Sequence, residues 1–163
     1  MTKDQLTLSR IKLLHPSLID EVNEIYDEID KVLGKGVVCR FSHTLRTNKE
    51  QDLLFSKKPK VTNARGGQSY HNYGLAIDIV LLLDKDINGT HETASWNTKL
   101  DFDKDGQSDL MEVVKIFKMY GWEWGGDWKF VDAPHFQKTF GLSIKQLQTL
   151  TNNKGGTNFK LPK

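Results

Sequence analysis

Hydrophobic residues in the first part of the chain recur every three or four positions, which is the spacing of an amphipathic helix. The apolar positions there are Leu18, Ile19, Val22, Ile25, Tyr26, Ile29 and Leu33, followed by Gly34 as a stop. We therefore predict one or two helices within residues 5–33, interrupted at 14–17, where Pro16 suits the first turn of a new helix. The same spacing predicts a helix over residues 110–120 that ends at Gly121.

Shorter apolar runs predict strands between these helices. Residues 37–41 and 75–83 are rich in β-branched and aliphatic side chains, as in short buried strands. Residues 50–55 favour a helix after the first strand, and Ser143 suits the N-cap of a short helix near the C-terminus. The chain thus mixes helices and strands, and it contains no internal repeat.

The composition fits one domain with a substantial core. The chain has 163 residues, of which 37% are hydrophobic and four are tryptophans, and single domains cluster at about 100–150 residues. We expect a single domain over residues 1–151. Residues 152–163 are rich in glycine, asparagine and lysine, and we expect them to form a flexible tail.

Charge and cysteine content exclude several classes of function. The formal net charge of +2 gives no bulk electrostatic reason to bind nucleic acid or an anionic membrane. The single cysteine, Cys39, excludes an internal disulfide and a multi-cysteine zinc cluster, so a metal would need histidine and carboxylate ligands. The N-terminal residues lack the apolar core of a signal peptide, and no run reaches membrane-spanning length. We therefore expect the protein to start in the cytoplasm.

Asp78 interrupts the apolar run of the second predicted strand. An ionised carboxylate in such a run is costly unless it is paired, hydrogen-bonded or bound to a metal. His71 lies upstream, beyond Gly74, which lets the chain bend close to the strand. An imidazole and a carboxylate placed together make half of a zinc site. A structural hydrogen bond between His71 and Asp78 explains this stretch equally well.

A second group of aromatic and titratable residues lies between residues 122 and 137. His135 follows Pro134, which fixes the backbone before it, and it supplies a third potential zinc ligand. Asp132 is near enough in the sequence to share a site with His135. Trp124 would form a wall of that site or pack in the core.

Residues 101–112 fit the pattern of a calcium loop, with acidic residues at alternate positions, a glycine sixth and a glutamate twelfth. The candidate ligands are Asp101, Asp103, Asp105, Gln107, Asp109 and Glu112. Gly106 would permit the sharp turn, and Glu112 would close the site with both oxygens. Ser108 at the eighth position and the lack of a clear preceding helix depart from the pattern. An acidic loop that caps the following helix is the alternative.

Two motifs in this order resemble the zinc-dependent peptidoglycan peptidases, which include D-Ala-D-Ala carboxypeptidases and L-alanoyl-D-glutamate peptidases. They are Ser-x-His-x-x-Gly-x-Ala-x-Asp, from Ser69 to Asp78, and Asp-x-Pro-His-Phe, which starts at Asp132. Glu-Trp-Gly-Gly-Asp-Trp before the second motif is closest to the L-alanoyl-D-glutamate branch, known from phage endolysins and bacterial autolysins. Leu-Arg-Thr-x-x-x-Gln, which contains Arg46, also matches, and the resemblance covers about residues 8–150. Asp132 departs from the Glu that D-Ala-D-Ala enzymes usually have at this position.

The resemblance implies a small single-domain α+β fold, in which helices pack on an antiparallel sheet with a zinc cleft, as in D-Ala-D-Ala peptidases and Hedgehog-like domains. His71, Asp78 and His135 would bind Zn²⁺ and leave a fourth position to water. Asp132 would accept a proton from that water and pass it to the leaving amine. Arg46, at a predicted strand-to-helix junction, would stabilise the oxyanion.

The resemblance further implies that Ser69, Glu123, Trp124 and Asp127 contact the substrate or support the ligands. We expect a monomeric zinc metallopeptidase that cleaves peptidoglycan stem peptides between L-Ala and D-Glu. The alternatives are a D-Ala-D-Ala carboxypeptidase and a non-catalytic module on the same fold that binds the cell wall or a metal. The enzyme would wait in the cytoplasm until a holin opens the membrane, or it would be a secreted protein whose leader has been removed.

Overall fold

A computed structural model describes residues 3–162 and has an α+β architecture. The strands are β1 (Val37–His43), β2 (Ala76–Leu83), β3 (Thr93–Ser95), β4 (Glu123–Trp124) and β5 (His135–Gln137). The α-helices are α1 (Gln5–Ile11), α2 (Ile19–Val32), α3 (Asn48–Phe55), α4 (Asp109–Met119) and α5 (Ile144–Leu150). The 3₁₀ turns are η1 (Pro16–Leu18), η2 (Tyr70–Tyr73) and η3 (Gly125–Asp127). The predicted combination of helices with an antiparallel sheet is confirmed.

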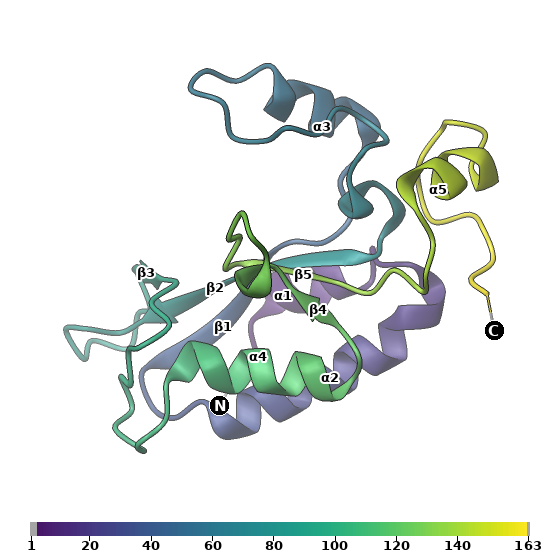
Figure 1. The fold of residues 1–163 in the computed structure, drawn as a ribbon. Helices are drawn as coiled ribbons and strands as arrows, with labels where there is room; N and C mark the ends of the chain where they lie inside the picture. The colour runs from purple at the N-terminus through teal and green to yellow at the C-terminus, as the bar shows by residue number, and fades with distance from the viewer. Residues whose placement is uncertain (1–2, 163) are drawn as a thin grey trace.

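The sheet is organised around β2, which pairs with three other strands. The order is β1-β2-β5-β4, with β3 also pairing with β2, and each of the four pairings is antiparallel. In Figure 1, α1, α2 and α4 lie along one side of the sheet, whereas α3 and the chain around it rise from the opposite side. The sheet thus has three helices along one side and the chain around α3 on the other.

The core lies between the sheet and α1, α2 and α4. Val22, Ile25 and Ile29 of α2 are fully buried, as the helical spacing of apolar residues predicted. Phe117 of α4 stacks on Phe136 of β5, with ring centroids 4.1 Å apart. Each such side chain contributes about 1.5–3 kcal/mol through burial. This packing holds β5 in place beside β2.

Local capping explains where the observed elements differ from the predicted ones. Pro16 begins η1, and α2 begins only at Ile19, because His15 caps a separate 3₁₀ turn before the helix. Helix α3 starts two residues earlier than predicted because Thr47 forms a capping box with Glu50. The predicted helix over 110–120 is α4, whose N-cap is Ser108.

The segment expected to be a flexible tail, residues 152–163, is described as far as 162 and lies against the domain. The carbonyl of Phe159 accepts a hydrogen bond from Nε2 of His15 at 2.7 Å, and the two rings lie 4.7 Å apart. The backbone N–H of Gly156 donates to the carbonyl of Asn72 at 2.7 Å. These contacts connect the C-terminal residues to η2. Within residues 3–162, no helix is long and apolar enough to cross a membrane.

Candidate metal centre and catalytic cleft

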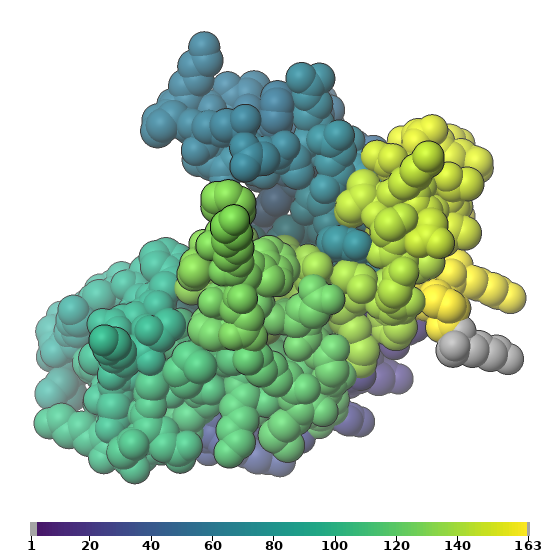
Figure 2. Space-filling view, in the orientation of Figure 1, coloured from purple at the N-terminus to yellow at the C-terminus, as the bar shows by residue number. Residues whose placement is uncertain are grey.

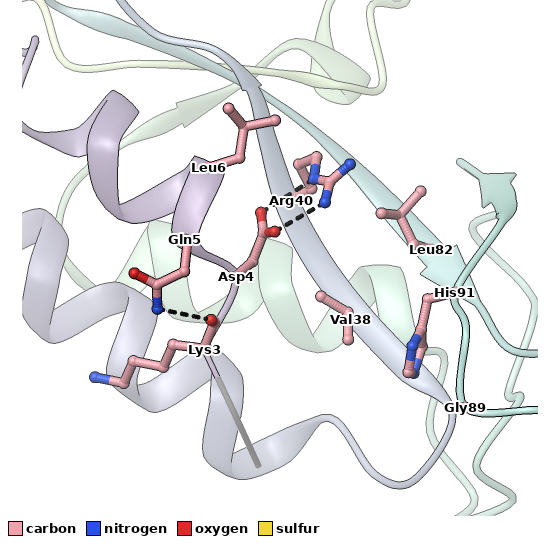
Figure 3. Close-up of a pocket in the computed structure, with 9 residues that line it drawn as sticks. All are labelled: Lys3, Asp4, Gln5, Leu6, Val38, Arg40, Leu82, Gly89 and His91. Atoms are coloured by element: carbon pink, nitrogen blue, oxygen red, sulfur yellow. Dashed lines mark hydrogen bonds and ion pairs between the residues drawn. The ribbon is translucent and has the colours of Figure 1, made fainter.

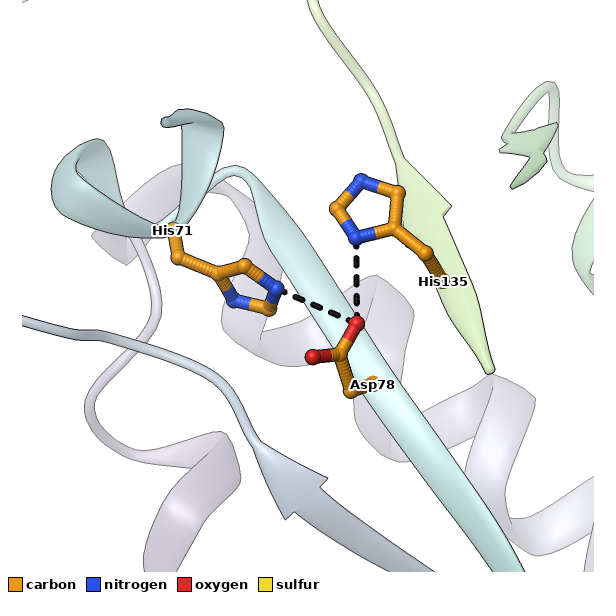
Figure 4. A group of neighbouring side chains, drawn as sticks. All are labelled: His71, Asp78 and His135. Carbon is orange, nitrogen blue, oxygen red and sulfur yellow. Dashed lines mark hydrogen bonds and ion pairs between the residues drawn. The ribbon is translucent and has the colours of Figure 1, made fainter. Parts of the chain in front are cut away.

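Two histidines and one aspartate from three elements converge on one point. His71 lies on η2, Asp78 on β2 and His135 on β5 (Figure 4). Oδ1 of Asp78 lies 3.1 Å from Nε2 of His71 and 3.0 Å from Nδ1 of His135. The potential ligand atoms lie within 4.8 Å of one another. The structure therefore brings together the three residues that the motifs singled out.

The backbone explains how this convergence arises. Asp78 is the direct cross-strand partner of His135, so the antiparallel register of β2 and β5 places both side chains on the same face. His71 reaches them because Gly74 ends η2 with a left-handed conformation (φ 67°) and turns the chain into β2. A Cβ on Gly74 would lie 2.5 Å from the backbone nitrogen of His15, so a larger residue does not fit there.

Hydrogen bonds hold both imidazoles by the nitrogen that faces away from Asp78. Nδ1 of His71 lies 2.8 Å from the carbonyl oxygen of Thr44, which is an acceptor, so this nitrogen carries the proton. Nε2 of His135 lies 2.9 Å from Oε1 of Gln137. The other nitrogen of each ring is then free to act as a ligand, as outer partners commonly arrange in metal sites.

The inner nitrogens fit a divalent cation. Nε2 of His71 is buried and has no hydrogen-bond partner of acceptable geometry. Burial opposes ionisation of Asp78, but the two adjacent histidines outweigh it and hold the pKa of Asp78 far below its ordinary value. A carboxylate that stays ionised and two neutral imidazoles form the donor set of many catalytic zinc sites, which leave one position open.

These three residues lie in a cleft of about 290 Å³. It is lined by His43, Arg46, Leu54, Val61, Thr62, Ser69, His71, Asp78, Asp132 and His135. Figure 2 shows the hollow between the chain around α3 and the loop that precedes β5. The two groups expected to assist catalysis, Arg46 and Asp132, therefore lie in the same opening as the three potential ligands.

The chain fixes Arg46 at the inner wall of this cleft. Its Nη1 donates to Oε1 of Gln51 at 2.9 Å, and its carbonyl accepts a hydrogen bond from Nδ2 of Asn72. The side chain is only 11% exposed, and Nη2 lies 3.7 Å from Oδ2 of Asp78. Its buried Nε has no partner among the described residues. Arg46 thus presents a positive charge and an unused donor beside the three potential ligands.

Asp132 also lines the cleft, and backbone hydrogen bonds hold it in place. Its N–H donates to the carbonyl of Gly125 at 2.9 Å, and its carbonyl accepts from the N–H of His135 at 3.1 Å. A Cβ on Gly125 would lie 2.4 Å from the carbonyl oxygen of Asp132, so this close approach requires glycine. Partial burial raises the pKa of Asp132, with a further contribution from Asp78, while the nearby histidines and Arg46 oppose the shift. Such a carboxylate is a better proton acceptor than an ordinary aspartate.

The four residues expected to contact substrate occupy different places. Ser69 lines the cleft, and its hydroxyl caps η2 by accepting from the N–H of His71. Glu123 accepts a hydrogen bond from Nε2 of Gln137 at 3.0 Å. Trp124 is buried, and its indole N–H donates to the carbonyl of Ala133. Asp127 pairs with Lys118 on α4, and none of these last three lines the cleft.

Sequence reasoning gave no role to several residues at the site. His43 is one of them: it lines the cleft, and its Nδ1 lies 3.9 Å from Oδ2 of Asp78. Gln137 directly follows the second motif, and its spacing of two from His135 on one strand was the available signal. The carbonyl of Thr44 could not have been found, because backbone acceptors leave no mark in the sequence.

Other features lie outside this cleft. A larger hollow of about 700 Å³ borders α1 and the start of the chain, and Figure 3 shows the pairing of Arg40 with Asp4 inside it. The residues that line it include only one histidine and one carboxylate, His91 and Asp4. The residues expected to bind calcium lie in the loop before α4, except for Asp109 and Glu112, which lie in the first turn of α4.

Comparison with known proteins places the same residues in a family context. A family model described as D-alanyl-D-alanine carboxypeptidase matches residues 62–138. The chain is 47% identical over 110 residues to the peptidoglycan L-alanyl-D-glutamate endopeptidase CwlK of Bacillus subtilis, which covers 64% of this chain and 62% of that protein. It is 30% identical over 126 residues to the L-alanyl-D-glutamate peptidase of Listeria phage A118, which covers 76% of this chain and 37% of that protein. The chain thus spans less than two thirds of the length of these curated relatives.

A solved structure supports the fold assignment. The crystal structure of the Serratia marcescens L-Ala D-Glu endopeptidase ChiX matches with a TM-score of 0.52 and 24% identity, over 83% of this chain and 87% of that one. The matched family segment contains His71, Asp78, Asp132 and His135. The predicted resemblance is confirmed: residues 62–138 match the family model described as D-alanyl-D-alanine carboxypeptidase, and the chain is similar to two curated L-alanyl-D-glutamate peptidases.

Proposed function

We propose that this protein is a zinc peptidase that hydrolyses the bond between L-Ala and D-Glu in peptidoglycan stem peptides. The observation that carries this proposal is the convergence of His71, Asp78 and His135 in one cleft with Asp132 and Arg46. A metal-binding module without catalytic function would have no need of a proton acceptor and an anion-stabilising donor in the same cleft as its ion. The cell-wall substrate means that the protein acts after release from the cytoplasm.

The three ligands would hold the metal, and the chain itself supplies the remaining groups. A bound Zn²⁺ would provide the Lewis acid that polarises the scissile carbonyl and lowers the pKa of the attacking water. Asp132 takes the proton of that water as it attacks and then delivers the proton to the leaving amine. Arg46 donates to the carbonyl oxygen as negative charge develops there, a type of contact whose loss costs about 3–4 kcal/mol of transition-state stabilisation.

The choice of bond rests on the relatives. The two curated relatives are named for cleavage between L-alanine and D-glutamate. The family model is instead described by D-alanyl-D-alanine carboxypeptidase activity. Cleavage after L-Ala frees the amino group of D-Glu, whereas the carboxypeptidase reaction releases the terminal D-Ala. The two reactions therefore give products of different composition from the same substrate.

The test is digestion of purified peptidoglycan by the zinc-loaded protein, followed by mass spectrometry of the soluble products. We expect stem peptides with D-Glu at their N-terminus and glycan that keeps only L-Ala. Release of free D-Ala alone would show that the protein catalyses the carboxypeptidase reaction and does not cleave the proposed bond. Binding to the cell wall without any product would overturn the assignment as an enzyme.

Substitution of Asp132 separates catalysis from metal binding. Asp132→Asn removes the proton acceptor but none of the three ligands, so we expect turnover to fall by at least about 10²-fold while zinc content stays at that of the wild type. His71→Ala should lose both zinc and activity. Wild-type turnover in Asp132→Asn would remove this residue from the proposed chemistry.

A further inference from the structure

Five carboxylates gather where the chain enters α4, and the proposed peptidase chemistry uses none of them. Asp101, Asp103 and Asp109 offer oxygens within 4.8 Å of one another, and so do Asp103, Asp105 and Glu112. Asp103 belongs to both groups, so the five side chains form one cluster. Among the residues that the structure describes, no lysine or arginine forms an ion pair with any of them.

Two of these carboxylates are buried with an oxygen that has no partner. Asp109 is 1% exposed and Glu112 is 8% exposed. Oδ1 of Asp109 and Oε2 of Glu112 accept no hydrogen bond from any residue in the described range 3–162. A buried carboxylate oxygen without a partner is costly, and like-charged neighbours increase that cost. Burial and the four surrounding aspartates also raise the pKa of Glu112 to about 7.

Several other oxygens of the cluster accept hydrogen bonds from backbone N–H groups. Oδ1 and Oδ2 of Asp101 accept from the N–H groups of Asp105 and Gly106, and Oδ2 of Asp103 accepts from the N–H of Gly34 at 2.7 Å. These bonds fix the side chains around a common centre. The bond to Gly34 also ties the loop to the end of α2.

We propose that the loop 101–112 binds a calcium ion through Asp101, Asp103, Asp105, Asp109, Glu112 and the backbone carbonyl of Gln107. Ca²⁺ takes six to eight oxygen ligands, and this cluster offers that number and type. The ion would neutralise the buried oxygens of Asp109 and Glu112. Because α4 begins at Asp109 and Asp103 bonds to Gly34, the bound ion would stabilise the junction between α2 and α4.

A neighbouring loop provides a control. Residues 84–92 also place acidic side chains together, with Asp84, Asp86 and Glu92 within 4.8 Å. Both oxygens of Asp84 already accept backbone N–H groups, those of Asn88 and Gly89, and Asp86 and Glu92 are exposed. This loop has no buried carboxylate oxygen without a partner among its described residues, so we do not assign calcium to it.

The experiment is thermal unfolding of the zinc-loaded protein, freed of calcium and then titrated with CaCl₂. At a calcium concentration about 100 times the dissociation constant, we expect the Tm to rise by about 5–10 °C. The same concentration of MgCl₂ should give a smaller rise, because Mg²⁺ prefers a smaller octahedral site. An unchanged Tm, or an equal rise with Mg²⁺, would overturn the proposal.

Two variants locate the site. Without calcium, Glu112→Gln should match or exceed the Tm of the wild type, because it removes a buried charge from an acidic cluster. With calcium, the wild type should become the more stable protein and Glu112→Gln should show little response, so the order of stabilities reverses. Asp86→Asn should retain the full calcium shift. Loss of the shift in Asp86→Asn, or its persistence in Glu112→Gln, would refute the assignment to this loop.

Discussion

At the scale of single residues, the function of the site depends on side chains that orient the ligands. Gln137 lies between His135 and Glu123: its Oε1 accepts from Nε2 of His135, and its Nε2 donates to Glu123. This chain of hydrogen bonds fixes which nitrogen of His135 faces Asp78. The orientation of this potential ligand thus depends on residues that would not themselves touch the metal.

Replacing Gln137 should weaken metal binding without removing a ligand. In Gln137→Leu, His135 loses the acceptor that holds its ring, so we expect the zinc affinity to fall by about 10–100-fold. Competition with a chromophoric chelator measures this change. Glu123→Gln is the matched control, since its amide oxygen can still accept from Gln137, and it should bind zinc nearly as well as the wild type. Equal affinities for all three proteins would show that Gln137 does not orient His135.

The grouping of the three potential ligands was predictable from the sequence, whereas the groups that hold them in place were not. His71, Asp78 and His135 belong to motifs with fixed spacing, and each is a residue type whose burial needs a specific partner. The acceptor for His71 is the carbonyl of Thr44, which any residue could have supplied. Sequence patterns identify the side chains that can bind a metal, but they do not reveal the backbone groups that hold those side chains in position.

At the scale of elements, an ion pair joins the start of α1 to β1. Asp4 is the N-cap of α1 and accepts two hydrogen bonds from the guanidinium of Arg40, as Figure 3 shows. Burial opposes ionisation of Asp4, but the bonds from Arg40 and Thr7 outweigh it, so the pKa of Asp4 lies below its ordinary value. A carboxyl group whose pKa is lowered by folding stabilises the protein above its unfolded pKa of about 3.9 and loses that contribution as pH falls.

Removing Arg40 should therefore have a pH-dependent effect on stability. We expect Arg40→Gln to lower the free energy of unfolding by about 1–2 kcal/mol at about pH 7. The difference from the wild type should shrink as the pH falls below about 4, because protonation of Asp4 removes the same interaction from the wild type. Urea denaturation at several pH values measures this. Lys12→Gln makes the same charge change at an exposed position, and a similar profile for both variants would argue against the ion pair.

Element boundaries show where local sequence rules were sufficient. The periodicity of 18–33 and the stop at Gly34 identified α2, yet Pro16 began a separate 3₁₀ turn because His15 caps it. Strand pairing was not predictable, because the register between Asp78 and His135 depends on packing across the whole sheet. The fold class followed from the resemblance, while the order β1-β2-β5-β4 required the structure.

At the scale of the whole molecule, the C-terminal residues pack on η2, the turn that contains the potential ligand His71. Phe159 contacts the rings of His15 and Tyr73, and Tyr73 is a fully buried residue of η2. This packing predicts that residues beyond 151 contribute to stability. The sequence predicted a flexible tail because residues 152–163 are rich in glycine and polar residues. The single aromatic residue of this segment, Phe159, makes the contacts that the composition did not indicate.

Phe159→Ala tests whether this packing persists in solution. Loss of a partly buried aromatic side chain should cost about 2 kcal/mol, which corresponds to a fall in Tm of about 4–8 °C for a chain of this size. Phe130, which is 86% exposed, provides the control, and Phe130→Ala should change stability by less than about 0.5 kcal/mol. If both substitutions were equally mild, residues 152–162 would be flexible as first expected.

The packing of Phe159 on η2 limits where another module can be fused to this protein. A module joined directly after α5 would displace this segment, so η2, which carries His71, would lose the contact between Phe159 and Tyr73, while Asp78 and His135 would stay on the sheet. A linker that starts beyond Phe159 leaves this packing intact, so a module attached there should not disturb turnover.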